Sequence, residues 1–305
     1  MATYASGKRR GQRCNNGGYY KYENEIRCGV HSKAKNRTKL IKNPNAEKKK
    51  RESETQRNVL IEKTARLNAQ DGKRGQIILT RLAMMRQIKH VDGFLKVFPN
   101  FKHQNRGDGF GCSELSPKSL GPIDHNQPGL PIAKNLENFH QGSKCFAPEL
   151  TPEGNPGSDF YKTQISMFED VIPHRHKPVV ISGKFKGNGN KNICLFWVWR
   201  RSDGTEVRFS YLECRQFYCN YYERLASKKD DFKLLLSKLE KGYNLQIVGY
   251  DAYPVIVPEG DTLAQVLEKR YTDMSRPFGH ELVLYTMLSV PTSDYPWRKH
   301  KTEEF

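Results

Sequence analysis

Residues 115–146 read LSPKSLGPIDHNQPGLPIAKNLENFHQGSKCF. Prolines and glycines make the first part of this stretch too irregular for a helix or a strand. The second part, NLENFHQGSKCF, predicts a short helix capped by Asn135. In such a helix Glu137, Gln141 and Lys144 recur at i, i+4 and i+7, so they share one face. A carboxylate, an amide and an ammonium on one face are typical either of an ordinary exposed helix or of the polar wall of a ligand pocket.

Positive charge is concentrated at the start of the 305-residue chain, whose net charge is +18. Residues 1–90 carry 23 Lys and Arg against 7 Asp and Glu, whereas the remaining residues carry 28 against 26. This asymmetry predicts electrostatic contact with the phosphates of DNA or RNA, and the alternative is a solvated basic arm without a specific partner. The residues expected to make this contact are Lys8, Arg9, Arg10, Arg13, Lys48, Lys49, Lys50 and Arg51.

The sequence predicts an intracellular protein that is not inserted in a membrane. Its first 13 residues are polar and basic, unlike a signal peptide. No apolar run approaches the ~18–20 residues that a membrane helix needs. Seven scattered cysteines, an odd number, favour reduced thiols over a disulfide framework.

Three of the first 31 residues have the chemistry of zinc ligands. Cys28 and His31 are spaced as two ligands of one tetrahedral ion, and Cys14 could supply the third. The local sequence offers no fourth ligand. A structural zinc ion and a pair of ordinary thiols beside a surface histidine are both compatible with this pattern.

We divide the chain into a small basic Cys/His element (1–45), a basic helix or linker (46–74), a globular body (75–298) and a flexible tail (299–305). Residues 76–82 and 245–253 have the pattern of buried strands, and 194–212 that of a hairpin with a turn at Asp203 and Gly204. Helical patterns cover 159–170, 213–226, 231–241 and 261–271. We therefore predict a single α+β or α/β body, with a mixed sheet surrounded by helices, behind a basic helical arm.

Further polar residues of the body fall at the ends of predicted elements. Asp251 lies at the end of the predicted strand within 245–253, where pocket carboxylates commonly project. Gly279 and His280 begin the last long helix, whose free N–H groups suit an anion. His174 and His176 would face the same way in a strand, either as metal ligands or in a basic loop that meets phosphate.

Aromatic residues recur at helical spacing in 213–226. Tyr218, Tyr221 and Tyr222 are expected either to form core or to stack on a nucleic-acid base.

Six segments of the body resemble an uncharacterised protein family of large nucleocytoplasmic DNA viruses. They read LSPKSLGP, NLENFHQGSKCF, PHRHK, FYCNYYERLA, NLQIVGYDAYP and RPFGHELVLYT, and together they extend over residues 77–297. This resemblance implies a viral context but no activity.

The stretch from SP to NLENFHQGSKCF is also similar to the NADAR family, in which a Glu…Gln…Lys helix helps to form a pocket for ADP-ribose or a related N-glycoside. The resemblance implies that Glu137 or Asp251 activates water or stabilises an oxocarbenium-like centre. It assigns ligand binding to four residues, namely Gln141, Lys144, Gly279 and His280. The Trp-Gly pair of that family is Phe278-Gly279 here. The alternative is a non-enzymatic virion or genome-packaging protein.

Overall fold

The computed structural model describes residues 19–22, 25–28, 38–39, 44–82, 88–100, 108–176 and 194–301, and only the backbone up to residue 51. The chain forms two compact units, Met1–Leu60 and Ile61–Phe305. Several predicted positions lie outside the described residues: Lys8, Arg9, Arg10, Arg13, Cys14 and His31. Only the backbone is described for Cys28 and for Lys48, Lys49, Lys50 and Arg51.

The first unit contains a small antiparallel sheet and the start of a long helix. Strands β1 (Tyr19–Tyr22), β2 (Glu25–Cys28) and β3 (Thr38–Lys39) are ordered β2-β1-β3. Helix α1 (Pro44–Gln70) follows, as the composition of 46–70 predicts, and it continues into the second unit.

The second half of α1 belongs to the globular body, which therefore begins earlier than the predicted boundary near residues 72–75. Ile61 and Ala65 are buried. The Asn68 amide donates to the carbonyl of Gly242 at 2.8 Å and to Asn244 Oδ1 at 3.1 Å. Gly242 has φ +87°, and a Cβ there would lie 2.5 Å from the carbonyl oxygen of Ala65. The helix and the turn before the last strand are thus in direct contact.

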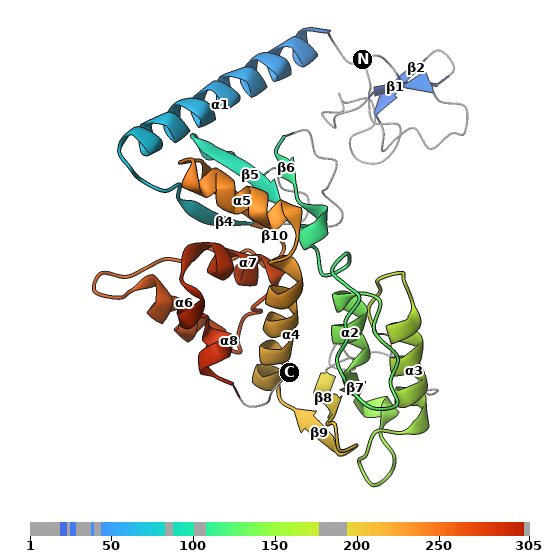
Figure 1. The fold of residues 1–305 in the computed structure, drawn as a ribbon. Helices are drawn as coiled ribbons and strands as arrows, with labels where there is room; N and C mark the ends of the chain where they lie inside the picture. The colour runs from blue at the N-terminus through green and yellow to red at the C-terminus, as the bar shows by residue number, and fades with distance from the viewer. Residues whose placement is uncertain are drawn as a thin grey trace. The chain divides into compact units, whose positions relative to one another are not determined.

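One of the two sheets of the body is parallel (Figure 1). Strands β4 (Ile77–Arg81), β5 (Phe94–Phe98), β6 (Phe110–Gly111) and β10 (Asn244–Gly249) are ordered β4-β10-β5-β6. All three pairings are parallel. Helices α5 (Asp230–Glu240) and α7 (His280–Ser289) contact β10, all of whose residues are buried. Because helices cover both faces of this strand, its polar residues Asn244 and Gln246 are buried together with its apolar ones.

A second, antiparallel sheet consists of β7 (Lys144–Phe146), β8 (Cys194–Arg200) and β9 (Glu206–Phe209), ordered β7-β8-β9. It confirms the predicted hairpin. The remaining elements of the body are α2 (Leu136–Gly142), α3 (Ser158–Glu169), α4 (Tyr211–Ala226), α6 (Leu263–Thr272), α8 (Pro296–Lys299) and the 3-10 helices Ser113–Leu115, Ala147–Glu149 and Thr292–Asp294. A parallel and an antiparallel sheet with helices around them make the body an α+β domain, as predicted, with the two strand directions in separate sheets and not in one mixed sheet.

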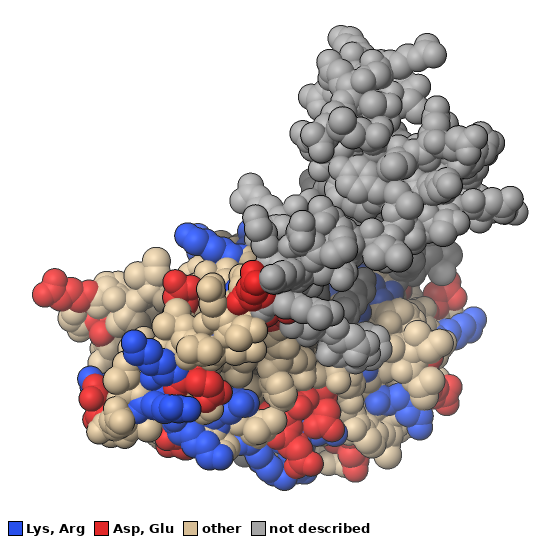
Figure 2. All heavy atoms as spheres, turned by 90° about the horizontal axis from the view of Figure 1, so that it is seen from above, with Lys and Arg blue, Asp and Glu red and all other residues tan. Residues whose placement is uncertain are grey.

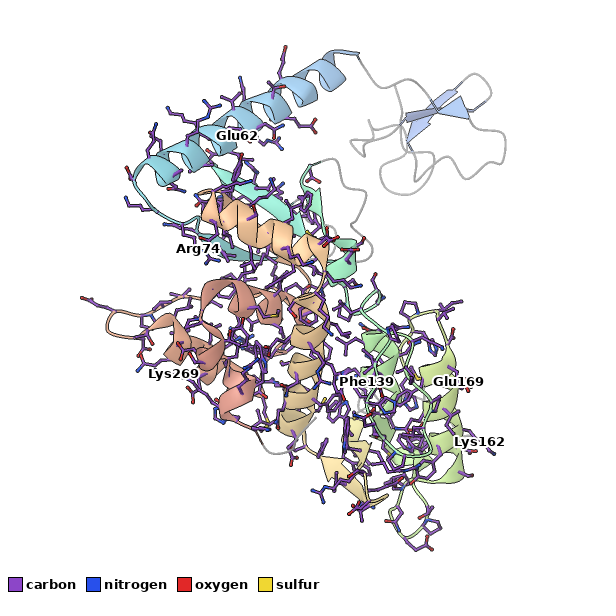
Figure 3. The ribbon with its side chains drawn as sticks, viewed as in Figure 1. Glu62, Arg74, Phe139, Lys162, Glu169 and Lys269 are labelled. Carbon is purple, nitrogen blue, oxygen red and sulfur yellow. The ribbon has the colours of Figure 1, made fainter. Side chains whose placement is uncertain are left out.

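Phe139, labelled in Figure 3, lies where α2, α3, α4 and β8 meet. Its ring contacts those of Phe168, Trp199, Phe217 and Tyr221 at centroid distances of 5.2 to 6.1 Å. Burial of α2 against this aromatic cluster fixes the helix that carries Glu137 and Gln141.

Helix α8, close to the last residue that the structure describes, carries a buried aromatic side chain. Trp297 is fully buried, and its indole N–H donates to Glu223 Oε2 at 2.8 Å. One large aromatic side chain therefore anchors the segment just before the predicted flexible tail, of which residues 302–305 lie outside the described part of the chain.

Basic and acidic side chains are interspersed on the described surface seen in Figure 2. Within the described ranges, no helix has both the length and the apolar character needed to cross a membrane.

Candidate functional site

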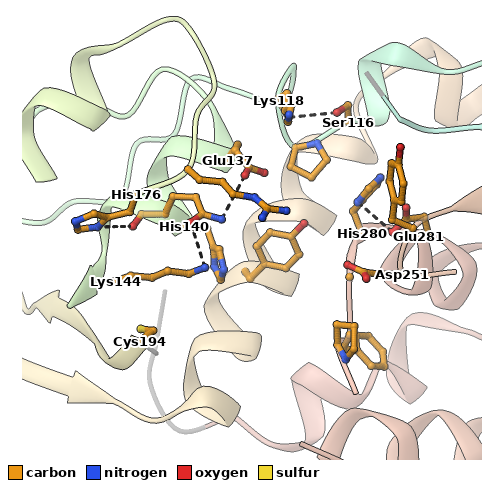
Figure 4. A pocket seen from close by; sticks show the side chains of 18 of the residues that line it. Ser116, Lys118, Glu137, His140, Lys144, His176, Cys194, Asp251, His280 and Glu281 are labelled. Carbon is orange, nitrogen blue, oxygen red and sulfur yellow. Dashed lines mark hydrogen bonds and ion pairs between the residues drawn. The ribbon is translucent and has the colours of Figure 1, made fainter. Parts of the chain in front are cut away.

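A cavity of about 1170 Å³ lies in the second unit (Figure 4). Its walls come from α2 and β7, from the loops at 116–118 and 175–176, and from the segments around the end of β10 and the start of α7. The six residues predicted to act on or bind a ligand all line it: Glu137, Asp251, Gln141, Lys144, Gly279 and His280. Figure 4 shows Glu137 and Lys144 facing Asp251 and His280 across it.

The first wall is a chain of three hydrogen-bonded polar side chains. The Asn135 side chain accepts from the Asn138 N–H at 2.8 Å, so it caps α2 as predicted. The Gln141 amide donates to Glu137 Oε1 at 3.3 Å and accepts from Lys144 Nζ at 3.2 Å. Lys144 is not on the helix, as the spacing suggested, because α2 ends at Gly142 and Lys144 is the first residue of β7. The bond to Gln141 nevertheless keeps its ammonium in line with the helix face.

The surroundings of Lys144 lower the pKa of its ammonium, with burial as the largest cause. Burial lowers the pKa of its ammonium, the thiols of Cys194 and Cys214 and the Glu137 carboxylate raise it, and nearby Arg175 lowers it. The Lys144 ammonium lies 5.9 Å from the centroid of the Trp197 ring. A partly desolvated ammonium makes strong hydrogen bonds to an anionic ligand, because little water has to be displaced.

The floor beside Lys144 is aromatic. Burial, and secondarily Lys144, lower the pKa of His140 well below its usual 6.5, so this imidazole is neutral. Its ring lies 5.1 Å from that of Tyr218 and 5.9 Å from that of Trp197. Burial also raises the pKa of the neighbouring Cys194 to about 12, so this thiol is protonated and unreactive.

The facing wall begins where β10 ends. A Cβ at Gly279 would lie 2.8 Å from Asp251 Cβ and 2.9 Å from Asp251 Oδ2. Glycine is therefore required for the start of α7 to approach Asp251 so closely. The positive end of the helix dipole favours a carboxylate at that place.

His280 is held on both of its ring nitrogens. Nε2 lies 3.2 Å from the carbonyl oxygen of Pro99, and Nδ1 lies 3.2 Å from Glu281 Oε2. A carbonyl only accepts hydrogen bonds, so Nε2 carries a proton. The Glu281 carboxylate is 1% exposed, and within the described part of the chain it makes no hydrogen bond of good geometry. His280 and Glu281 therefore lie within ion-pair distance of each other without forming a hydrogen bond.

The loop before residue 177 contributes Arg175 to the cavity. The next residue, His176, holds this loop in place. His176 is buried, with Nε2 2.5 Å from Glu149 Oε1 and Nδ1 3.2 Å from the Gln141 carbonyl oxygen. His174 is exposed and pairs with Asp170 at 3.2 Å, so the two histidines do not form one site. This contradicts the idea that they bind one metal.

Sequence reasoning assigned no role to several residues of the cavity. Lys118 lies in the quoted LSPKSLGP segment, but nothing in its spacing placed it in a pocket. Glu281 and Trp197 lie in apolar stretches of the sequence, which predict only that these residues belong to the hydrophobic core. Of the tyrosines, Tyr218 lines the cavity, whereas Tyr221 and Tyr222 are buried. Periodicity alone could not separate these cases, because all three lie on one helix.

Among the residues that the structure describes, no group of three or more His, Cys, Asp and Glu side chains is placed to hold a metal ion. Comparison with known proteins adds no assignment, since no protein-family model, curated protein or solved structure matches this chain.

Proposed function

We propose that the globular body is a NADAR-like hydrolase that binds a nucleotide or ADP-ribosyl N-glycoside and cleaves its C–N bond. The observation that carries the proposal is the cavity that Glu137 and Asp251 line together with Lys144 and Arg175. Two carboxylates facing each other across a polar cavity provide the groups that glycoside hydrolysis needs.

The reaction requires a water molecule, a base for its proton and stabilisation of positive charge on the sugar. The water oxygen attacks the anomeric carbon of the sugar, and the C–N bond breaks. The electron pair of that bond leaves with the nitrogen of the nucleobase. One carboxylate takes the proton of the water, and the other stabilises the oxocarbenium-like centre. Glu137 is the better candidate for the first role, because Gln141 fixes its carboxylate by a hydrogen bond.

The phosphates of the ligand fit the cationic wall better than the start of α7. Asp251 Oδ2 lies beside Gly279, so a phosphate at the N–H groups of α7 would meet a negative charge. Lys144, Arg175 and Lys118 offer three cations on the other side. We therefore assign phosphate binding to these residues and assign to His280 contact with the sugar or base.

The aromatic floor of the cavity suits the nucleobase of the ligand. Trp197, Tyr211 and Tyr218 line the cavity near Lys144. Stacking of a base on an aromatic ring contributes about 1–3 kcal/mol.

The basic arm supports a second part of the proposal, that the protein is a viral-type protein associated with nucleic acid. We expect residues 1–72 to supply most of the affinity for DNA or RNA and a steep dependence on salt. An arm that holds zinc through Cys14, Cys28 and His31 should contain close to one equivalent of the metal. Removing residues 1–60 without weakening DNA or RNA binding would contradict this part.

The rival proposal is a virion or packaging protein without catalytic activity. Such a body would be expected to fill its interior with apolar side chains at this place. The polar lining of the cavity favours the hydrolase.

The test combines a thermal-shift screen with a hydrolysis assay on ADP-ribose, NAD and ADP-ribosylated nucleic acid. Glu137→Gln should abolish hydrolysis and keep ligand binding, because it removes the charge and preserves the shape. The matched control is Glu169→Gln, the same change at an exposed position on α3, labelled in Figure 3. The hydrolase proposal is wrong if no ligand shifts the melting temperature and no substrate is cleaved, or if both variants lose activity equally.

A further inference from the structure

Outside the cavity, three arginines surround a single tyrosine. The guanidinium carbons of Arg81, Arg270 and Arg276 lie 4.4, 5.6 and 5.8 Å from the centroid of the Tyr253 ring. Arg81 is the last residue of β4, Arg270 lies in the last turn of α6, and Tyr253 follows β10. Separate parts of the chain thus bring three cations to one ring.

The cluster has less negative charge than positive charge. Arg270 pairs with Asp273 at 3.2 Å. For Arg81 and Arg276, both exposed, the described residues provide no ion pair. The pKa of Arg270 is lowered, first by burial and then by the charge of Arg276. Three like charges held together in this way suit an anionic ligand with more than one negative group.

A fourth arginine holds the turn that carries Arg276. The buried Arg215 donates to the backbone carbonyls of Tyr271, Asp273 and Arg276. Its guanidinium stacks on the ring of Tyr211 at 4.6 Å. Three hydrogen bonds from one buried side chain fix residues 271–276, so the cluster is organised before a ligand binds.

The cluster adjoins the cavity along the chain. Tyr250 and Asp251 line the cavity, and Tyr253 follows two residues later. On the second segment Pro277 lines the cavity directly after Arg276. A ligand that leaves the cavity past either segment would meet the arginines.

We infer that Arg81, Arg270 and Arg276 form a binding site for neighbouring phosphates of a nucleic-acid strand. The fork of a guanidinium matches two oxygens of a phosphate, which an ammonium does not. The position of the strand relative to the cavity rests on the proposed function, whereas the phosphate contacts do not. A nucleoside diphosphate offers the same phosphate chemistry, so the experiment includes it as a separate probe.

The experiment uses the full chain and a fluorescein-labelled 12-nucleotide single strand of DNA, with affinity measured by anisotropy over a range of salt concentrations. Arg81→Gln/Arg276→Gln is compared with the control Arg208→Gln/Arg224→Gln. The control pair is also exposed, and its guanidiniums also lie over rings, at 4.7 and 5.0 Å. Both doubles lose two charges and two ring contacts. The basic arm is unchanged in each, so its contribution cancels.

Loss of two phosphate contacts should weaken binding severalfold and reduce the slope of log affinity against log salt by about 1.4, from ~0.7 per phosphate. The control double should keep the slope of the wild type. Equal slopes and affinities in the two doubles would overturn the inference. The inference would also be overturned if the cluster variant kept its affinity for the DNA strand and lost only the thermal shift caused by ADP. Because the strand is unmodified and nothing is cleaved, a failure here differs from a failure of Glu137→Gln to abolish hydrolysis.

Discussion

The contact between the second half of α1 and the body predicts where the chain can be shortened. Residues 61–305 should form a stable fragment, whereas 75–305 should be close to unfolding at room temperature. The shorter fragment loses the buried side chains of Ile61 and Ala65 and both hydrogen bonds of Asn68. It also exposes Gly242, whose backbone lies against the helix.

The loss can be estimated from these contacts. Burial of an isoleucine contributes about 2 kcal/mol and that of an alanine methyl just under ~1 kcal/mol. Each hydrogen bond of Asn68 contributes about 1 kcal/mol. The free energy of unfolding should therefore fall by about 5 kcal/mol, which is a large share of the ~5–15 kcal/mol typical of a domain.

Urea denaturation of the two fragments, followed by far-UV circular dichroism, measures this difference. Point variants provide a matched comparison on the same helix. Ile61 is 7% exposed and Leu67 is 50% exposed. Ile61→Ala should cost about 2–3 kcal/mol, near the lower end for buried isoleucines, and Leu67→Ala less than ~1 kcal/mol. Equal free energies of unfolding for the two fragments, or equal costs for the two variants, would refute the reasoning.

Three further predictions concern the cavity and the end of the chain. Because burial lowers the pKa of Lys144 below 10.5, the unfolded chain keeps this proton over a pH range in which the folded chain has released it. Wild type should therefore gain stability relative to Lys144→Met as the pH rises towards 10.5, and parallel urea titration curves would contradict this. Gly249→Ala should prevent stable folding, because its Cβ would lie 1.8 Å from Glu281 Oε1; Glu281→Ala should restore a cooperative thermal transition, and failure of this rescue would disprove the clash. Trp297→Phe should cost about 2–3 kcal/mol in chemical denaturation, since Glu223 loses a donor and the core loses volume, whereas a loose tail predicts no change.

Elements with a strong local signal were predictable from the sequence. The cap at Asn135, the hairpin of β8 and β9, and the buried strand β10 agree with the expectation. Each depends on neighbouring residues: a side chain that accepts from its own helix, a turn between paired strands, or a short stretch rich in apolar residues.

Features that depend on contacts between distant residues were not predictable. Lys144 begins a strand because residues 144–146 pair with β8, and helix periodicity carries no information on that pairing. Arg175 reaches the cavity because the next residue, His176, is bound to Glu149. Trp297 looks like part of a polar tail until Glu223 is placed beside it.

In the candidate site, too, residues with a local signal were predictable, and features that depend on contacts between distant residues were not. Glu137 and Gln141 share a face by helix geometry alone, and Asp251 and Gly279 were singled out because they lie at the ends of predicted elements. The distance between the two walls depends on how β10 and α7 pack against the remainder of the body. Lys118 and Glu281 were missed because one lies in an irregular loop and the other in an apolar helix.

The order of strands in the parallel sheet has a consequence for how the chain is made. Strands β4 and β5 do not pair with each other, because each pairs with β10, which the ribosome synthesises about 150 residues later. At ~5–20 residues per second, both early strands emerge and wait about 7–30 s with unpaired edges. Such edges readily join strands of other chains. Assembly of the body during translation therefore depends on keeping residues 77–98 apart from neighbouring nascent chains until residue 249 has left the exit tunnel.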